Sequence, residues 1–138
     1  EKLKRRTVYL PLRRANLPTL LNLFDFGDAT SMQGKRQLTN VSTQALFWLN
    51  SEFLTDRSTQ LAQAVLSDKT KDNAARIGTL YTRILNRQAN AAEIANAQQY
   101  LAGFKAKFAA QEADKAELKA WQSFCRVLMA SNDFLYLD

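Results

Sequence analysis

Histidine is absent from the 138 residues of this chain, and the sequence holds only one cysteine, two prolines and four glycines. Without histidine the chain lacks the commonest general base, the commonest transition-metal ligand and the usual partner of a serine or cysteine nucleophile. The lone cysteine, Cys125, excludes an intrachain disulfide, a CxxC zinc motif and a CxxCH haem attachment within this sequence. We therefore expect no haem, no tightly bound transition metal and no other cofactor in this chain.

Scarce glycine and proline disfavour a turn-rich β-sandwich and favour helices, and 46% hydrophobic residues suffice for the core of one domain. No apolar run approaches the roughly 20 residues that a bilayer-spanning helix needs. We therefore expect no membrane span. The chain opens on EKLKRR, without the apolar run of a signal peptide. We expect it to be a fragment of a longer protein.

The net charge of +6 is concentrated near the N-terminus, where residues 1–36 hold eight Lys or Arg and three Asp or Glu. Such a basic arm suits binding to nucleic acid or to an anionic surface. It equally suits pairing with an acidic face of a neighbouring domain. Because the sequence has no helix-turn-helix, RNP or zinc-finger motif, we rank nucleic-acid binding behind the other functions.

The densest apolar stretch is Gln44–Leu66, and it predicts two helices that meet at Asn50–Ser51. Their predicted core stripe is Ala45, Leu46, Leu49 and Phe53, continued by Leu61, Ala64 and Val65. Most aromatic side chains are expected in the core, Phe53 among them. Phe47 and Trp48 are adjacent and point to different sides of a helix, so we expect one of them to face a partner domain or a ligand.

Three further helices follow from periodicity and capping signals. Ala74–Arg87 is strongly amphipathic and begins beside Asp72 or Asn73. Asn90 and Glu93 form a capping box for the next helix, and Asp114–Glu117 opens the last one in a similar way. The predicted core positions are Ile77, Leu80, Tyr81, Ile84, Leu85, Ile94, Ala97, Leu101, Phe104, Phe108, Leu118, Trp121, Phe124, Cys125, Leu128 and Met129. The apolar tail Phe134–Leu137 is expected to dock back on the bundle.

The N-terminal third is less regular. Thr7–Leu12 is predicted to be extended, Leu17–Phe26 to form a short helix and Gly27–Ser42 to form a long loop. Together these segments predict an all-α fold: a compact bundle of about five or six helices, with an extended N-terminal segment packed over it. We expect a single domain across residues 1–138.

The strongest candidate site combines polar residues that flank or interrupt the apolar segments of the N-terminal third: Arg13, Arg14, Asp25, Arg36 and Gln44. Clustered arginines bind carboxylate, sulfate or phosphate groups bidentately. Alternatively, Asp25 is ionised and held by an arginine, while Gln44 bonds backbone groups of the loop, and we favour this structural interpretation.

Carboxylates offer a second, weaker possibility. Asp25, Asp28, Glu52 and Asp56 are the candidates for an acid and base pair of the kind that glycosidases use. Glu52 and Asp56 are separated by one helical turn, which is more typical of a solvated helix face, and no motif supports catalysis. Cys125 lies on an apolar stripe and is interpreted as an inert buried thiol.

Three segments together resemble a known family: KRRTVYLPLRRANLPTLLNLFDF with RQLTNVSTQALFWLNSEFL, then RIGTLYTRILNRQANAAEIANAQQYL, then WQSFCRVLMASNDFLYLD. In this order they are similar to the C-terminal part of the planctomycete PSD1 domain, a domain of unknown function (DUF1553). The chain matches that pattern at Asp25, Arg36 and Gln44. It departs from the pattern at Ser42-Thr43, where the family has a proline, and at Asn86-Arg87-Gln88, where the family has Gly-Arg-Pro.

The resemblance implies a large exported protein of planctomycetes and related bacteria, located in the periplasm, at the cell surface or outside the cell. It implies a c-type cytochrome domain elsewhere in that protein, so that haem belongs to the full-length product and not to this chain. It implies no established activity.

Two functions from different classes remain. The favoured one is a non-catalytic structural or interaction module, whose partners are other domains of the same polypeptide or a separate protein. The alternative is a part of an enzyme that acts on a polysaccharide or another anionic polymer and is completed by missing domains. An anionic glycan would then be the ligand.

Overall fold

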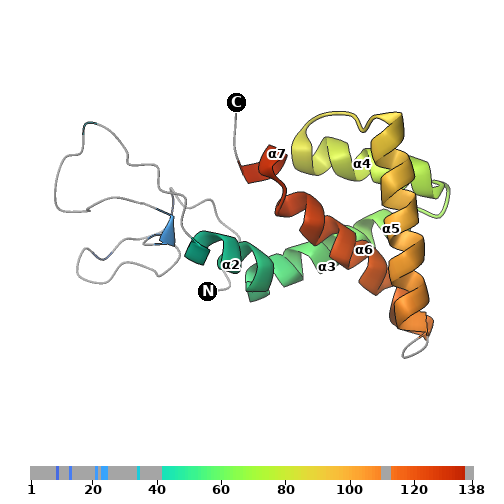
Figure 1. Ribbon diagram of the computed structural model, residues 1–138, viewed down its shortest axis with the longest axis horizontal. Helices are drawn as coiled ribbons and strands as arrows, with labels where there is room; N and C mark the ends of the chain where they lie inside the picture. Colours follow the sequence, from blue (N-terminus) through green and yellow to red (C-terminus); the bar gives the residue numbers. More distant parts are fainter. Residues whose placement is uncertain are drawn as a thin grey trace. The chain divides into compact units, whose positions relative to one another are not determined.

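The computed structural model describes residues 42–109 and 113–135, together with Tyr9, Arg13, Leu21, Leu23, Phe24 and Gly34; for residues 42, 45, 49, 113 and 114 it describes the backbone only. Within these residues the labelled elements are six helices (Figure 1). They are α2 (Ser42–Asn50), α3 (Glu52–Ser67), α4 (Asn73–Leu85), α5 (Ala91–Ala109), α6 (Ala113–Met129) and α7 (Asn132–Leu135). The predicted all-α class is confirmed.

The chain divides into two units, residues 1–44 and residues 45–138, and each is described by itself. In the first unit Leu21 is buried and helical, and Leu23 is half-buried and helical, in agreement with the short helix predicted over Leu17–Phe26. Most of Thr7–Leu12 and Gly27–Ser42 lies outside the described residues. The extended segment packed over the bundle, and the single domain, therefore stay predictions.

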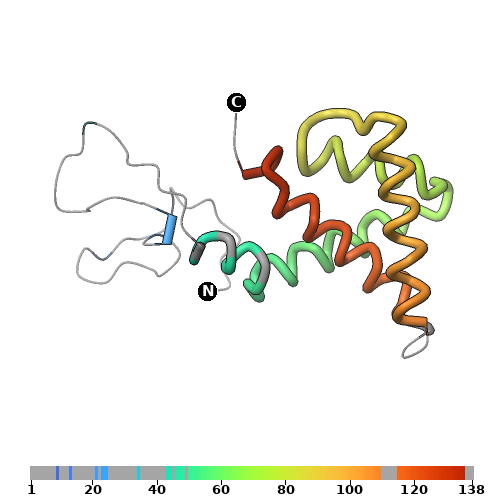
Figure 2. The backbone as a smooth tube through the Cα atoms, viewed as in Figure 1, coloured from blue at the N-terminus to red at the C-terminus, as the bar shows by residue number. Residues whose placement is uncertain are grey.

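In the second unit α6 packs against both α3 and α5, and α4 contacts all three of these helices. Figure 2 shows α6 running back from the lower end of α5 at an angle to it, and the two helices pack against each other. The buried cluster draws side chains from each of the four helices: Ala62, Val65, Ile77, Leu80, Tyr81, Ala97, Leu101, Ala120, Trp121, Phe124, Cys125 and Leu128. The predicted core faces of α4, α5 and α6 are therefore confirmed, with Ile84, Leu85, Ile94, Phe104, Phe108 and Leu118 half-buried.

The starts of α4 and α5 follow the predicted capping chemistry, and Asn90 and Glu93 exchange the two hydrogen bonds of a capping box. Asp72 accepts a hydrogen bond from the Ala75 N–H at 2.8 Å, which satisfies one orphan donor of the first turn. At the other end Asn86 has φ 53°, in the left-handed region that favours glycine and, among other residues, asparagine.

The break between α2 and α3 at Ser51 is as predicted, but the core face of α3 is not. Ser51 is extended, with φ −65° and ψ 128°, so the apolar stripe of α2 is out of register with α3. Phe53 and Ala64, which the stripe places in the core, are exposed, and Leu46 of α2 is exposed as well. The buried face of α3 is Leu54, Ser58, Ala62 and Val65. Ser58 is satisfied within the core because its Oγ donates to the Thr55 carbonyl at 2.8 Å.

Candidate interaction surface

The arginine site predicted from the sequence falls mostly outside the described residues, which exclude Arg14, Asp25 and Arg36. Arg13 is exposed. Gln44, in the first turn of α2, donates from Nε2 to the Leu23 carbonyl at 2.9 Å. Its acceptor therefore lies ahead of the loop Gly27–Ser42 and not within it. The ion pair of Asp25 with an arginine stays a prediction.

An apolar groove of about 470 Å³ opens on the second unit, between side chains of α2, α3, α6 and α7. It is lined by Trp48, Phe53, Leu54, Arg57, Gln60, Leu61, Met129 and Phe134, and we call this set the apolar groove. Phe53 is 57% exposed and Phe134 is 38% exposed. Large apolar side chains that gather in an exposed groove are typical of an interaction site.

Trp48 of α2 contacts one aromatic ring of its own helix and one of α7. Its ring makes edge-on contacts with Phe47, at 6.0 Å between centroids, and with Phe134 of α7, at 5.7 Å. Such geometry is favoured because the positive ring edge meets the negative face. Trp48 is half-buried and lines the groove. That one of Phe47 and Trp48 faces a partner domain or a ligand stays a prediction. The docked tail is seen in part through this Phe134 contact, while residues 136–138 lie outside the described residues.

Arg57 is the charged member of the apolar groove. Its guanidinium lies 5.1 Å from the centroid of the exposed Phe53 ring and donates to Gln60 Oε1 at 3.2 Å. Its Nε is buried without a hydrogen-bond partner. Among the described residues it makes no ion pair, although Glu52 and Asp56 lie exposed on the same helix. A guanidinium that lines an apolar groove without an ion pair favours an occupant that carries a carboxylate, because arginine binds carboxylates strongly.

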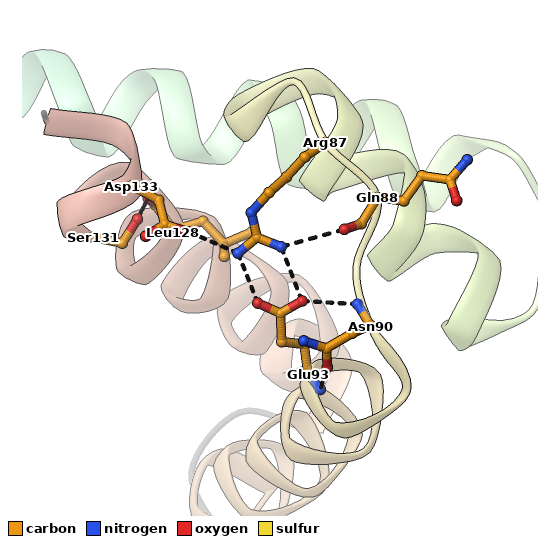
Figure 3. Close-up of polar contacts among 7 residues, drawn as sticks. All are labelled: Arg87, Gln88, Asn90, Glu93, Leu128, Ser131 and Asp133. Atoms are coloured by element: carbon orange, nitrogen blue, oxygen red, sulfur yellow. Dashed lines mark hydrogen bonds and ion pairs between the residues drawn. The ribbon is translucent and has the colours of Figure 1, made fainter. Parts of the chain in front are cut away.

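A second polar feature lies next to the groove and is drawn in Figure 3. Arg87, directly after α4, binds Glu93 of α5 bidentately, with Nη1–Oε2 at 3.0 Å and Nη2–Oε1 at 2.7 Å. Its Nη2 also reaches Asp133 of α7 at 2.6 Å, and its Nη1 donates to the Gln88 carbonyl at 3.2 Å. The guanidinium lies 5.2 Å from the Tyr81 ring centroid. We call Arg87, together with Glu93, Asp133 and Tyr81, the arginine clamp.

The arginine clamp shifts the titration of its members. Hydrogen bonds from Arg87, and then from the Asn90 N–H at 2.8 Å, hold the pKa of Glu93 below its ordinary value. Hydrogen bonds to Glu93 and Asp133 raise the pKa of Arg87 further above neutrality. Burial, and then the Glu93 charge, raise the pKa of Tyr81. Arg87 and Glu93 are therefore charged at neutral pH, and the clamp joins α4, α5 and α7.

No spacing or motif in the sequence predicts the arginine clamp. Arg87 and Asp133 are 46 positions apart, and no local pattern pairs them. The available signal was the family resemblance, because Tyr81, Arg87 and Glu93 lie in the second quoted segment and Asp133 lies in the third.

A shallower hollow of about 390 Å³ lies along α5. It is lined by Asn96, Gln99, Tyr100, Gly103, Phe104 and Lys107. The Tyr100 and Phe104 rings stack at 5.7 Å, and the Tyr100 and Ser123 hydroxyls share a hydrogen bond of 2.7 Å. A Cβ atom added at Gly103 would meet nothing within 4 Å, so the space beside Gly103 is open.

Within the described residues, no group of three or more His, Cys, Asp or Glu side chains is placed to hold a metal ion. None of the helices in the described part of the chain is long and apolar enough to cross a bilayer.

The fold and its surface define a small helical module with an exposed apolar groove and an arginine clamp. The sequence matches the profile of PSD1, described as a protein of unknown function (DUF1553), over residues 1–101, and the chain belongs to this family. The matched range includes Arg87 and Glu93 and ends within α5, before Asp133. No curated protein and no solved structure matches the chain.

Proposed function

We propose that this chain is a non-catalytic interaction module of a larger exported multidomain protein, and that its apolar groove docks against another domain of the same polypeptide. The observation that carries the proposal is the exposure of Phe53 and Phe134 around a groove floored by Trp48, Leu54 and Met129. An apolar side chain of this size gains about 1.5–3 kcal/mol when it is buried, so a partner surface would stabilise the groove substantially.

The charge of the groove narrows the chemistry of the partner surface. Arg57 lines the apolar groove and makes no ion pair among the described residues. A docking surface with apolar side chains and one carboxylate opposite Arg57 satisfies both features. The neighbouring domain therefore presents an apolar ridge that carries an Asp or Glu.

The proposal is tested by comparing the full gene product with this chain alone. Phe53→Ser should leave the unfolding midpoint of the isolated chain nearly unchanged, because the ring is 57% exposed. In the full product it should destabilise this module by about 1.5–3 kcal/mol, because the ring is buried there. The matched control is Val127→Ser, since Val127 is 50% exposed but does not line the groove. An equal effect of Phe53→Ser in the two contexts would reject the groove as the interface.

The alternative function, a contribution to an enzyme that acts on an anionic polysaccharide, draws on the hollow of α5. Aromatic faces, side-chain amides and a lysine are groups that bind sugar rings, hydroxyls and carboxylates. Alginate, an acidic polysaccharide, should then bind, neutral dextran should not, and Lys107→Gln should weaken the binding. If the Lys107→Gln chain binds alginate as well as the wild-type chain does, the alginate binds to the basic arm and not to the hollow of α5.

We also propose that this chain binds no haem and no transition metal tightly, since it has no histidine and one cysteine. A Soret band in the purified chain, or stoichiometric metal by elemental analysis, would contradict this.

A further inference from the structure

The short helix α7 lines one side of the apolar groove but contributes no side chain to the buried core. It has four residues, and none of them is buried. Its backbone is closed by bonds from the Phe134 and Leu135 N–H groups to the Ser131 carbonyl, both at 3.1 Å. An isolated turn of this length is not stable by itself. Its position therefore depends on the side chains that it contributes to neighbouring elements.

Two adjacent residues of α7 make those contacts on different elements. Asp133 Oδ2 lies 2.6 Å from Arg87 Nη2, and Phe134 lies edge-on to Trp48 at 5.7 Å. The first contact is electrostatic and joins α7 to the arginine clamp. The second is apolar and narrows the groove. Asp133 and Phe134 are neighbours in the chain, so one short backbone segment carries both contacts.

The two ion pairs of Arg87 differ in how readily they break. The Glu93 contact is bidentate, and Glu93 also accepts from the Asn90 N–H as part of the capping box. The Asp133 contact uses one oxygen, and its side chain is 53% exposed against 24% for Glu93. An exposed single contact is weak and is screened by salt. Arg87 therefore stays on Glu93 when Asp133 leaves.

We propose that the Arg87–Asp133 ion pair is a latch that holds α7 against the bundle and so sets the width of the apolar groove. When the pair breaks, α7 turns about Ser131 and carries Phe134 away from Trp48. The groove then admits a wider partner surface. This inference rests on the proposed role of the groove, to which it adds a means of regulation by ionic strength or by a competing charge.

The test uses the two tryptophans of the chain as reporter and internal reference. Trp48 lines the groove, whereas Trp121 is 2% exposed in the core. In ¹⁵N-labelled protein, the Asp133→Asn substitution should shift the indole N–H signal of Trp48 and leave that of Trp121 in place. Loss of one exposed ion pair should raise the population with Trp48 released by about two- to five-fold. Asp133→Glu, which keeps the carboxylate, should restore the original signal.

The matched control is Asp68→Asn, which removes an exposed pair with Lys71 at 3.5 Å, away from α7. It should move neither indole signal. Wild-type protein in about 1 M NaCl, where the screening length is roughly 3 Å, should approach the Asp133→Asn spectrum. Because the salt titration uses the wild-type protein, it does not depend on whether a variant folds. An unmoved Trp48 signal in both experiments overturns the latch, and so does a joint shift of Trp48 and Trp121, which would report general loosening.

The result of this experiment does not depend on the proposed function, because it is measured on the chain alone, without a partner. A latch that fails this test leaves the comparison of Phe53→Ser in the isolated chain and the full product unaffected. Conversely, a groove that proves not to be an interface leaves the coupling of Asp133 to Trp48 measurable.

Discussion

Replacing Leu80 by alanine is the sharpest test of the fold, because the chain contains a leucine of opposite environment for comparison. Leu80 is 0% exposed at the centre of the buried cluster, and Leu46 is 55% exposed on α2. Both substitutions remove the same atoms. At Leu80 the change loses the transfer free energy of those atoms and leaves a cavity that α3, α5 and α6 hold open, so about 2–5 kcal/mol is expected.

At Leu46 the same change should fall within about 0.5 kcal/mol of zero, as for most exposed positions. Urea unfolding followed by far-UV circular dichroism gives both values, and unchanged m-values would show that the unfolded states are comparable. If Leu80→Ala lowers the free energy of unfolding by no more than Leu46→Ala does, Leu80 is not a core residue. That result would mean that the amphipathic stripe of α4 does not face the core.

Further predictions concern single groups. Burial raises the pKa of the Cys125 thiol to about 12, so a thiol reagent such as DTNB should react at mildly alkaline pH only after unfolding, and rapid reaction of the folded chain would show that the thiol is accessible. Because the pKa of Glu93 is lowered from 4.5 in the folded state, its stabilisation is present above that pH and is lost as the pH falls below it. Glu93→Gln should therefore flatten the dependence of the unfolding midpoint on pH below 4.5, and an unchanged slope would contradict the clamp. Asn86, with φ 53°, should tolerate glycine without loss, whereas Asn86→Ala should cost about 1 kcal/mol; equal stability of the two variants would contradict the left-handed conformation.

The sequence predicts well what local patterns determine. The cap at Asp72, the capping box of Asn90 and Glu93 and the buried faces of α4 and α6 follow from helical spacing and from side chains that bond nearby backbone. Each of these depends on residues within a few positions of one another. The periodicity is strongest where no break interrupts it.

The predictions are wrong or missing where the structure depends on a local change in chain direction or on a contact between residues far apart in the sequence. At Ser51 one extended residue puts α3 out of register with α2, which exposes Phe53. The arginine clamp joins Arg87 to Asp133 across 46 positions, and the apolar groove combines four elements. Neither follows from periodicity, because each depends on how the helices pack. The candidates Arg14, Asp25 and Arg36 lie outside the described residues and stay predictions.

Hydrogen–deuterium exchange tests the central claim most directly, through the exchange rates of the backbone amides of residues 53–61 on α3, which supply most of the groove. The exchange of this segment is compared between the chain alone and the full gene product, with helix α4, which supplies no residue to the groove, as reference. If the groove docks against another domain, residues 53–61 exchange more slowly in the full product while the reference is unchanged. Identical exchange of residues 53–61 in the two proteins would contradict the claim that the groove is an interface.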